Sequence, residues 1–404
     1  MRPGTPSFVG VRLREVREAR GLTQGALGEM LGVSNRAVSQ YEGGKVSPHP
    51  DVAVKLPGVL NVPMAFFLDP VRASEPEGTV FWRSMSAATG AARARAERRF
   101  DWFKRLVDFL GGYVRFPAVG FPDWDFPSDL TAIGDGDVEA AAVRLRAHWK
   151  LGSGPISNVV YLLENNGAAV GRITLAADTL DAFSQWRQRE DRPYVVLGAD
   201  KGSAARSRWD AAHELGHMIV HRRVPPGVLR HTTEFQRMEL QAHDFAGAFL
   251  LPAETFADDF VVPTLDSLQA LKLKWNVSMS AMLMRARKLR LISREQEQRF
   301  WRSYAKKGYK RGEPFDDRVP PEQPVLGRQS IVLLLDQRIV SRDQLRAALP
   351  YSAGDIEELA ALPPGFLGDD PQVHLLARRD ANVPRRPAPT GDPTILQFPG
   401  VRRG

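Results

Sequence analysis

The sequence A-A-H-E-L-G-H at residues 211–217 decides the character of the larger part of this 404-residue chain. A spacing of four places His213 and His217 one above the other on the same face of a helix. Two imidazoles in that arrangement can hold one Zn²⁺ through ring nitrogens at about 2.0–2.1 Å. Glu214 lies beside them but is rotated away, where the glutamate of this motif takes a proton from the attacking water instead of ligating. The motif therefore predicts a zinc helix with Glu214 as general base.

A catalytic zinc needs a third protein ligand and one open coordination position. The candidates lie just downstream, where E-L-Q-A-H at 239–243 places Glu239 and His243 four residues apart. We favour Glu239 as the third ligand, with His243 as its rival. His221 continues the ladder of histidines, and we interpret it as a residue that supports a ligand or caps the helix, with ligation as the alternative. Glu234 and Asp244 are the remaining alternatives.

A second motif lies near the N-terminus, where L-T-Q-G-A-L-G-E-M-L-G-V-S-N-R-A-V-S-Q-Y spans residues 22–41. Thr23 and Ser34 are suitable N-caps and Gly32 ends a helix, so the stretch predicts two short helices joined by a tight turn. Such a pair projects its second helix into the major groove of DNA, where Asn and Gln suit adenine and Arg suits guanine. The predicted base contacts are Asn35, Arg36, Ser39 and Gln40, and the predicted phosphate contacts are Arg14, Arg17 and Lys45. Gln24, at the start of the preceding helix, is predicted to contact either the DNA backbone or a base. A dimerisation or protein-binding module is the alternative for this fold.

Composition limits the remaining possibilities. The chain is too long for one ordinary core, so we expect more than one domain. It has no cysteine, which excludes disulfides and thiolate metal ligands and suits a reducing cytoplasm. The net charge of +8 favours an anionic partner such as nucleic acid. No apolar N-terminal signal and no apolar run of the ~20 residues that a membrane helix needs are present, so we expect a cytoplasmic protein without a membrane partner.

Two resemblances follow from these motifs. Residues 8 to about 69 are similar to Xre-type, phage-repressor-like helix-turn-helix domains. The sequence R-x-R-W-D-A-A-H-E-L-G-H-M-I-V-H, followed by E-L-Q-A-H-D-F-A-G-A-F-L-L-P, resembles the ImmA/IrrE family of zinc metallopeptidases over roughly 140–300. That resemblance implies His213, His217 and Glu239 as ligands of Zn²⁺ and Glu214 as general base. His243 departs from the family, which usually carries Asn there.

The resemblance extends to the strands that precede the zinc helix. L-D-A-F-S-Q-W at 180–186 and P-Y-V-V-L at 193–197 resemble the strand region of the family, in which an edge strand could hold an extended substrate peptide. Phe183, Ser184 and Trp186 are candidates to line that groove, with core packing as the alternative for the aromatic residues. Arg206, Arg208 and His231 are candidates to stabilise the oxyanion.

These observations predict a multidomain, mainly α-helical protein with a small β-sheet, of the α+β class. A five-helix helix-turn-helix domain is followed by a zincin-like metallopeptidase domain and a helical C-terminal region. The expected boundaries are 8–69 for the DNA-binding domain, 70–136 for a linker and a basic helix, 137–300 for the peptidase domain, 301–380 for the helical region and 381–404 for a disordered tail.

The expected function is a DNA-binding transcriptional regulator with zinc metalloendopeptidase activity. The resemblance implies a repressor protein as substrate, whose cleavage derepresses stress, DNA-damage or mobile-element genes. A homodimer is the usual solution for this class of DNA-binding domain. The alternative is a DNA-binding regulator or antitoxin-like protein whose zinc domain is catalytically silent.

Overall fold

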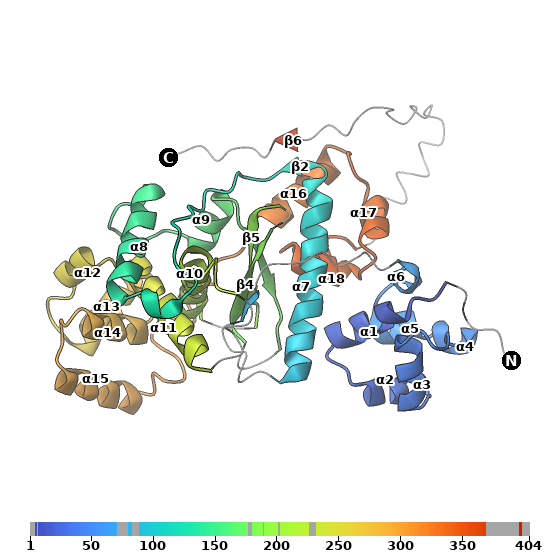
Figure 1. The fold of residues 1–404 in the computed structure, drawn as a ribbon, viewed down its shortest axis with the longest axis horizontal. Coiled ribbons are helices and arrows are strands. Elements are labelled where there is room, and N and C mark those ends of the chain that lie inside the picture. The colour runs from blue at the N-terminus through green and yellow to red at the C-terminus, as the bar shows by residue number, and fades with distance from the viewer. Residues whose placement is uncertain are drawn as a thin grey trace. The chain divides into compact units, whose positions relative to one another are not determined.

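The computed structural model describes residues 5, 7–70, 80–82, 89–176, 180–188, 190–200, 203–225, 232–368 and 396–397. The chain divides into two compact units (Figure 1). Unit 1 contains residues 1–73, 89–116 and 325–404, and unit 2 contains residues 74–88 and 117–324. This division differs from the boundaries expected from the sequence, because each unit is built from segments that are separated along the chain. The predicted disordered tail at 381–404 lies outside the described residues except for 396–397.

Unit 1 begins with the predicted helix-turn-helix. Thr23 and Ser34 cap their helices as expected, since their hydroxyls accept the backbone N–H groups of Ala26 and Ala37 at 3.1 and 3.2 Å. Gly32 has a φ of 72°, a left-handed conformation that ends the first of these helices. The described stretch has six helical segments where the sequence predicts five, and the fourth is a single turn. They are α1 (Gly10–Ala19), α2 (Gln24–Leu31), α3 (Asn35–Glu42), α4 (Pro50–Ala53), α5 (Leu56–Leu60) and α6 (Met64–Leu68).

The basic helix and the C-terminal helices complete unit 1. Trp102 on α7 (Gly90–Gly111) donates its indole N–H to Glu15 of α1 at 2.7 Å and stacks on Tyr351 with ring centroids 4.6 Å apart. Arg20, the C-cap of α1, donates two hydrogen bonds to the carboxylate of Asp355 at 2.7 and 2.6 Å. The helical C-terminal region therefore packs with the DNA-binding helices in one unit. Its helices are α16 (Leu326–Asp336), α17 (Arg342–Ala348) and α18 (Ala353–Leu359), and a short parallel pair joins β2 (Val114–Arg115) to β6 (Leu396–Gln397).

Unit 2 contains a four-stranded sheet in the order β1-β4-β5-β3. The strands are β1 (Val80–Trp82), β3 (Ala169–Ile173), β4 (Ala182–Arg187) and β5 (Arg192–Gly198). β3 and β5 are parallel, whereas β4 is antiparallel to both of its neighbours. Every residue of β3 and β4 is buried, so neither strand shows the alternation of a half-exposed strand.

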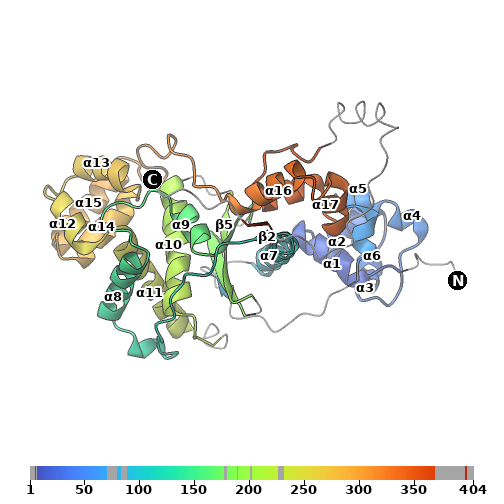
Figure 2. The same cartoon turned by 90° about the horizontal axis from the view of Figure 1, so that it is seen from above.

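One long buried helix connects the sheet to the rest of unit 2. The helix α10 (Ala204–Val220) packs against β4, β5 and α11 (Thr232–Leu250) (Figures 1 and 2). Gly216 permits the close approach of α10 to α11, because a Cβ there would lie 3.1 Å from Phe245 Cδ1 and 3.2 Å from the Ala242 backbone. The other helices of unit 2 are η1 (Leu130–Ala132), α8 (Asp135–His148), α9 (Val159–Asn165), α12 (Ala253–Asp259), α13 (Leu265–Trp275), α14 (Met279–Lys288) and α15 (Arg294–Lys306). Among the described residues, no helix has the length and apolar character needed to cross a membrane.

Candidate metal centre

Three predicted ligands converge between α10 and α11. The Nε2 atoms of His213 and His217 lie 3.1 Å apart. The two carboxylate oxygens of Glu239 lie 3.3 Å from these nitrogens, Oε2 next to His213 and Oε1 next to His217. His213 and His217 are buried, at 2% and 0% exposure, while Glu239 is partly exposed at the rim. The helices α10 and α11 therefore present two imidazoles and one carboxylate to a common point.

The spacing of these atoms fits a zinc ion. Bonds of about 2.0–2.1 Å in tetrahedral geometry place neighbouring ligand atoms about 3.3–3.4 Å apart. The two Nε2 atoms, 3.1 Å apart, and each Nε2 with the carboxylate oxygen nearest to it, 3.3 Å apart, have separations near that edge length, with a different oxygen of Glu239 facing each histidine. Two histidines and one glutamate are also a donor set of catalytic zinc sites, which leave a fourth position open. The residues present thus fit Zn²⁺, with His213, His217 and Glu239 as its ligands.

Glu214 is buried completely and has a dedicated hydrogen-bond donor. The hydroxyl of Ser184, on β4, donates to Glu214 Oε2 at 2.5 Å. This contact fixes one carboxylate oxygen, and Glu214 is not part of the cluster of candidate metal ligands found among the described residues. The sequence placed Ser184 only as a candidate groove residue, since nothing in a local pattern relates a strand hydroxyl to a glutamate 30 positions later.

A chain of hydrogen bonds extends from His217 away from the ligand atoms. His217 Nδ1 and His221 Nδ1 are 2.9 Å apart, and His221 Nε2 lies 3.1 Å from Gln241 Oε1. The Gln241 amide in turn donates to the backbone carbonyls of Leu130 and Ile133 at 3.0 and 2.9 Å. Because the amide must donate at its nitrogen, its oxygen accepts from His221 Nε2–H, and His221 Nδ1 then accepts from His217 Nδ1–H. That tautomer leaves His217 Nε2 unprotonated, as a metal ligand requires.

The same chain requires a neutral His221. Burial lowers the pKa of His221 well below its usual value, and the neighbouring His217 lowers it further. His221 is absent from the cluster of candidate metal ligands found among the described residues. The structure thus places His221 behind His217, in the supporting position that the sequence favoured over ligation.

The other alternative ligands lie elsewhere. His243 packs against Trp209 with ring centroids 4.8 Å apart and lines a separate cavity with Leu240 and Met284. Asp244 accepts a hydrogen bond from Lys288 at 2.5 Å, and Glu234 is exposed. None of the three belongs to the convergent cluster of described residues. Glu234 and Asp244 each lie five positions from Glu239, which turns them about 140° around α11. His243 is turned by only about 40° but lies one helical turn further along, where it packs on Trp209.

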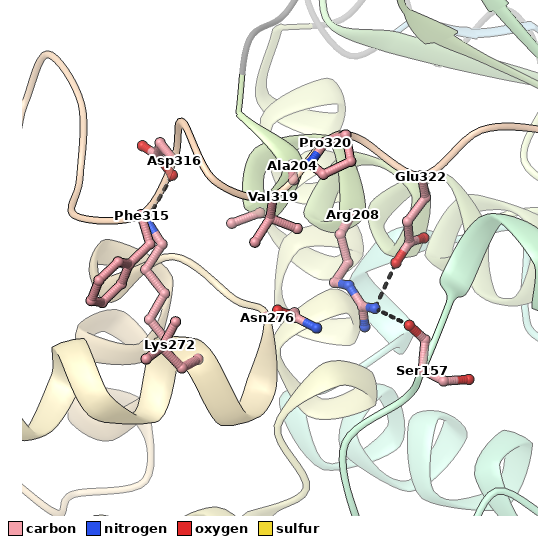
Figure 3. A pocket seen from close by; sticks show the side chains of 12 residues that line it. Ser157, Ala204, Arg208, Lys272, Asn276, Phe315, Asp316, Val319, Pro320 and Glu322 are labelled. Atoms are coloured by element: carbon pink, nitrogen blue, oxygen red, sulfur yellow. Dashed lines mark hydrogen bonds and ion pairs between the residues drawn. The ribbon is translucent and has the colours of Figure 1, made fainter.

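Arg208 does not face the candidate centre. Its guanidinium donates to the carbonyls of Ile156 and Ser157 at 2.6 and 2.8 Å and pairs with Glu322 at 2.5 Å (Figure 3). Burial lowers the pKa of Arg208 despite the opposing effect of Glu322. Arg208 thus ties α10 to the segment that follows α15, and its prediction as an oxyanion donor is wrong.

The other two oxyanion candidates receive no support. Arg206 pairs with Asp181 at 2.6 Å, and its own side chain is 54% exposed. His231 lies outside the described residues.

Strand β4, whose residues were candidates for an edge strand that holds substrate, has a neighbouring strand on each side. Residues 80–82 form β1 and pair with the side of β4 that faces away from β5. Phe183 and Trp186 are buried, at 0% and 6% exposure. Their burial agrees with the alternative that these aromatic residues pack in the core. The sequence assigned Val80–Trp82 to a linker, although a β-branched residue followed by two aromatic residues is a signal for a strand.

The helix-turn-helix presents most of the predicted base contacts to solvent. Asn35, Arg36 and Ser39 are exposed on α3, and Gln40 is half-buried. Gln24 donates to Glu42 Oε2 at 2.8 Å, so it connects α2 to α3.

One predicted phosphate contact is wrong. Arg17 is buried and makes two hydrogen bonds to the Glu42 carboxylate, at 2.5 and 3.0 Å. Its guanidinium holds α1 to α3 and is unavailable to DNA. Arg14 remains 60% exposed beside Glu18, and Lys45 is exposed.

Comparison with known proteins agrees with this division of roles. A helix-turn-helix family model matches residues 13–67, and a model described as an IrrE N-terminal-like domain matches residues 163–287. Two curated relatives are described as "Putative HTH-type transcriptional regulatory protein". One, from Methanocaldococcus jannaschii, is 43% identical over 60 residues, which are 15% of this chain and 19% of the relative. The other, from Pyrococcus furiosus, is 41% identical over 172 residues, which are 41% of this chain and 51% of the relative.

Proposed function

We propose that this chain, which joins a helix-turn-helix domain to an IrrE N-terminal-like domain, is a DNA-binding transcriptional regulator with a zinc-dependent endopeptidase in unit 2. The observation that carries the proposal is the convergence of His213, His217 and Glu239 beside a buried Glu214. A purely structural zinc site has no use for a buried carboxylate that stays outside the ligand set. The relatives named as transcriptional regulators support the DNA-binding half of the proposal.

The residues of the site divide the work of peptide hydrolysis. His213, His217 and Glu239 would hold the zinc, which when bound would supply Lewis acidity toward the scissile carbonyl and the attacking water. Glu214 accepts a proton from that water and returns it to the leaving amine. Ser184 holds Glu214 in place through Oε2 and so acts as a positioning residue. The chain from His217 to His221 and Gln241 orients the ligand imidazole and keeps its metal-facing nitrogen unprotonated.

We propose a repressor protein as the substrate, whose cleavage switches on the genes that it silences. The competing possibility is a regulator whose zinc domain is silent. The dedicated hydrogen bond to Glu214 favours catalysis, because burying a carboxylate is costly without a role that needs it.

Metal content measured by mass spectrometry tests the site. We expect one zinc per chain in the wild type, loss of zinc in His213→Ala and Glu239→Ala, and retention in the control His243→Ala. Wild-type protein that purifies with no stoichiometric metal and binds none on addition would contradict the proposal.

The catalytic role is tested in cells that express either wild-type protein or Glu214→Gln. New protein N-termini that appear only with the wild type would identify the substrate. The variant should keep zinc and DNA binding, since it changes neither a ligand nor unit 1. Identical sets of N-termini in the two strains would favour the silent alternative.

A further inference from the structure

Strand β1 occupies an unusual place in the chain. Residues 74–88 belong to unit 2, whereas the residues before 74 and those at 89–116 belong to unit 1. The chain therefore leaves unit 1, contributes one strand to the sheet of unit 2, and returns to unit 1. At that strand Val80, Phe81 and Trp82 pair antiparallel with Gln185, Ser184 and Phe183 of β4.

This strand pairs with β4 opposite the residue that contacts the candidate general base. Phe81 is the register partner of Ser184, and the Ser184 hydroxyl donates to Glu214. A backbone paired there runs past the residue that positions the general base. An extended peptide that adds to a sheet edge gains its affinity from the same ladder of main-chain hydrogen bonds. The strand β1 thus fills the position that a peptide would take by strand addition to β4.

We propose that β1 is an internal competitor for this peptide-binding edge, so that a protein substrate binds by displacing Val80–Trp82 from β4. This inference rests on the proposed endopeptidase function and specifies how access to its site is regulated. A ladder of three residues is short and offers few hydrogen bonds, so a longer extended segment can replace it. Because both ends of the competitor continue into unit 1, the strand that covers the peptide-binding edge is tethered at each end to the DNA-binding unit.

A disulfide lock tests the competition directly. Paired residues in an antiparallel ladder have Cα atoms about 4.5–5.5 Å apart, which is compatible with a disulfide. The chain has no cysteine, so Val80→Cys combined with Gln185→Cys creates a unique bridge between β1 and β4. The single variant Val80→Cys is the control, because it cannot form the bridge. All variants carry Glu214→Gln, which prevents cleavage of the probe.

The probe is a fluorescent peptide with the sequence of residues 74–88, and its binding to the full-length, zinc-loaded chain is followed by anisotropy. We expect oxidation of the double variant to weaken binding at least about tenfold relative to its reduced form, with no change in the control. Equal affinity in the oxidised and reduced forms would overturn the proposal.

A second variant opens the edge without cysteine. Phe81→Pro removes a backbone N–H from β1 and disfavours its pairing with β4. The variant should therefore bind the probe at least about tenfold more tightly than the protein with the original Phe81. Circular dichroism and zinc content check that unit 2 remains folded. Binding that is equally tight, or equally absent, with and without Phe81→Pro would contradict the competition. These measurements report binding and not cleavage. A zinc domain without catalytic activity would therefore still show the competition, whereas an incorrect competition proposal would not.

Discussion

His221 Nδ1 lies 2.9 Å from His217 Nδ1, so a buried, non-ligating histidine supports a candidate zinc ligand directly. The contact continues through Gln241 to the backbone at Leu130 and Ile133. It therefore connects the C-terminal end of α10 to α11 and to the segment that precedes α8. The orientation of the ligand depends on three parts of the fold that are distant along the chain.

Removing this support should weaken the metal site without abolishing it. We expect His221→Ala to lower zinc affinity about 10- to 100-fold, because the tautomer and orientation of His217 are no longer fixed. Competition with a chromophoric zinc chelator measures the change. His243→Ala is the matched control on α11 and should leave the affinity unaltered. An unchanged affinity in His221→Ala would show that the contact has no role in metal binding.

A side chain at Gly216 should disturb the contact between α10 and α11. Gly216→Ala places a Cβ 3.1 Å from Phe245 Cδ1 and 3.2 Å from the Ala242 backbone, and we expect a loss of about 1–3 kcal/mol in the free energy of unfolding. Urea unfolding followed by circular dichroism measures it. Gly136→Ala on α8 is the control, since a Cβ there meets nothing within 4 Å. A Gly216→Ala protein as stable as the control would refute the steric argument.

Unit 1 should lose stability in acid through Asp355. Burial raises the pKa of Asp355, but the two hydrogen bonds from Arg20, that from Ser352 and the charge of Arg99 outweigh it, so the net pKa is lowered. A carboxyl with a lowered pKa in the folded state stabilises the fold above its unfolded pKa, and this contribution disappears as the pH falls through the folded pKa.

Asp355→Asn should therefore cost about 1–3 kcal/mol near neutral pH, because it leaves the partly buried Arg20 without its counter-charge. The difference from the wild type should shrink as the pH falls below about 4. Hydrogen exchange of amides in α1 and α18 at several pH values measures both effects. A difference that stays constant with pH would exclude the ionised carboxylate as its source.

Base recognition and phosphate contact should separate in two variants of unit 1. Arg36→Ala should cost about 1–3 kcal/mol on the preferred DNA sequence and relax the preference at one base pair. Lys45→Ala should weaken binding to all sequences alike and reduce the slope of log affinity against log salt concentration by about one. Binding-site selection from a random duplex pool, followed by titrations at several salt concentrations, distinguishes them. If Arg36→Ala left the selected sequence unchanged, α3 would not be the base-reading helix.

Local sequence patterns were sufficient for several features of this protein. The spacing of His213 and His217 required one helical face, and the caps at Thr23 and Ser34 defined two helices with the turn between them. These features depend on neighbours within about four residues, where helical geometry makes the outcome calculable. Glu239 was nominated from its position downstream of the motif and from the family resemblance, and α11 brings its carboxylate to the two imidazoles.

Tertiary structure alone decided the rest. The choice of Glu239 over His243 depends on which turn of α11 lies opposite His213 and His217, and the partnership of Ser184 with Glu214 joins a strand to a helix. Arg17 carries the charge of a phosphate contact, yet its burial against Glu42 removes it from the surface. The pairing of Val80–Trp82 with β4 crosses about a hundred residues of chain. Contacts of this kind are set by long-range packing and by which backbone edges find each other, and no short window of sequence contains that information.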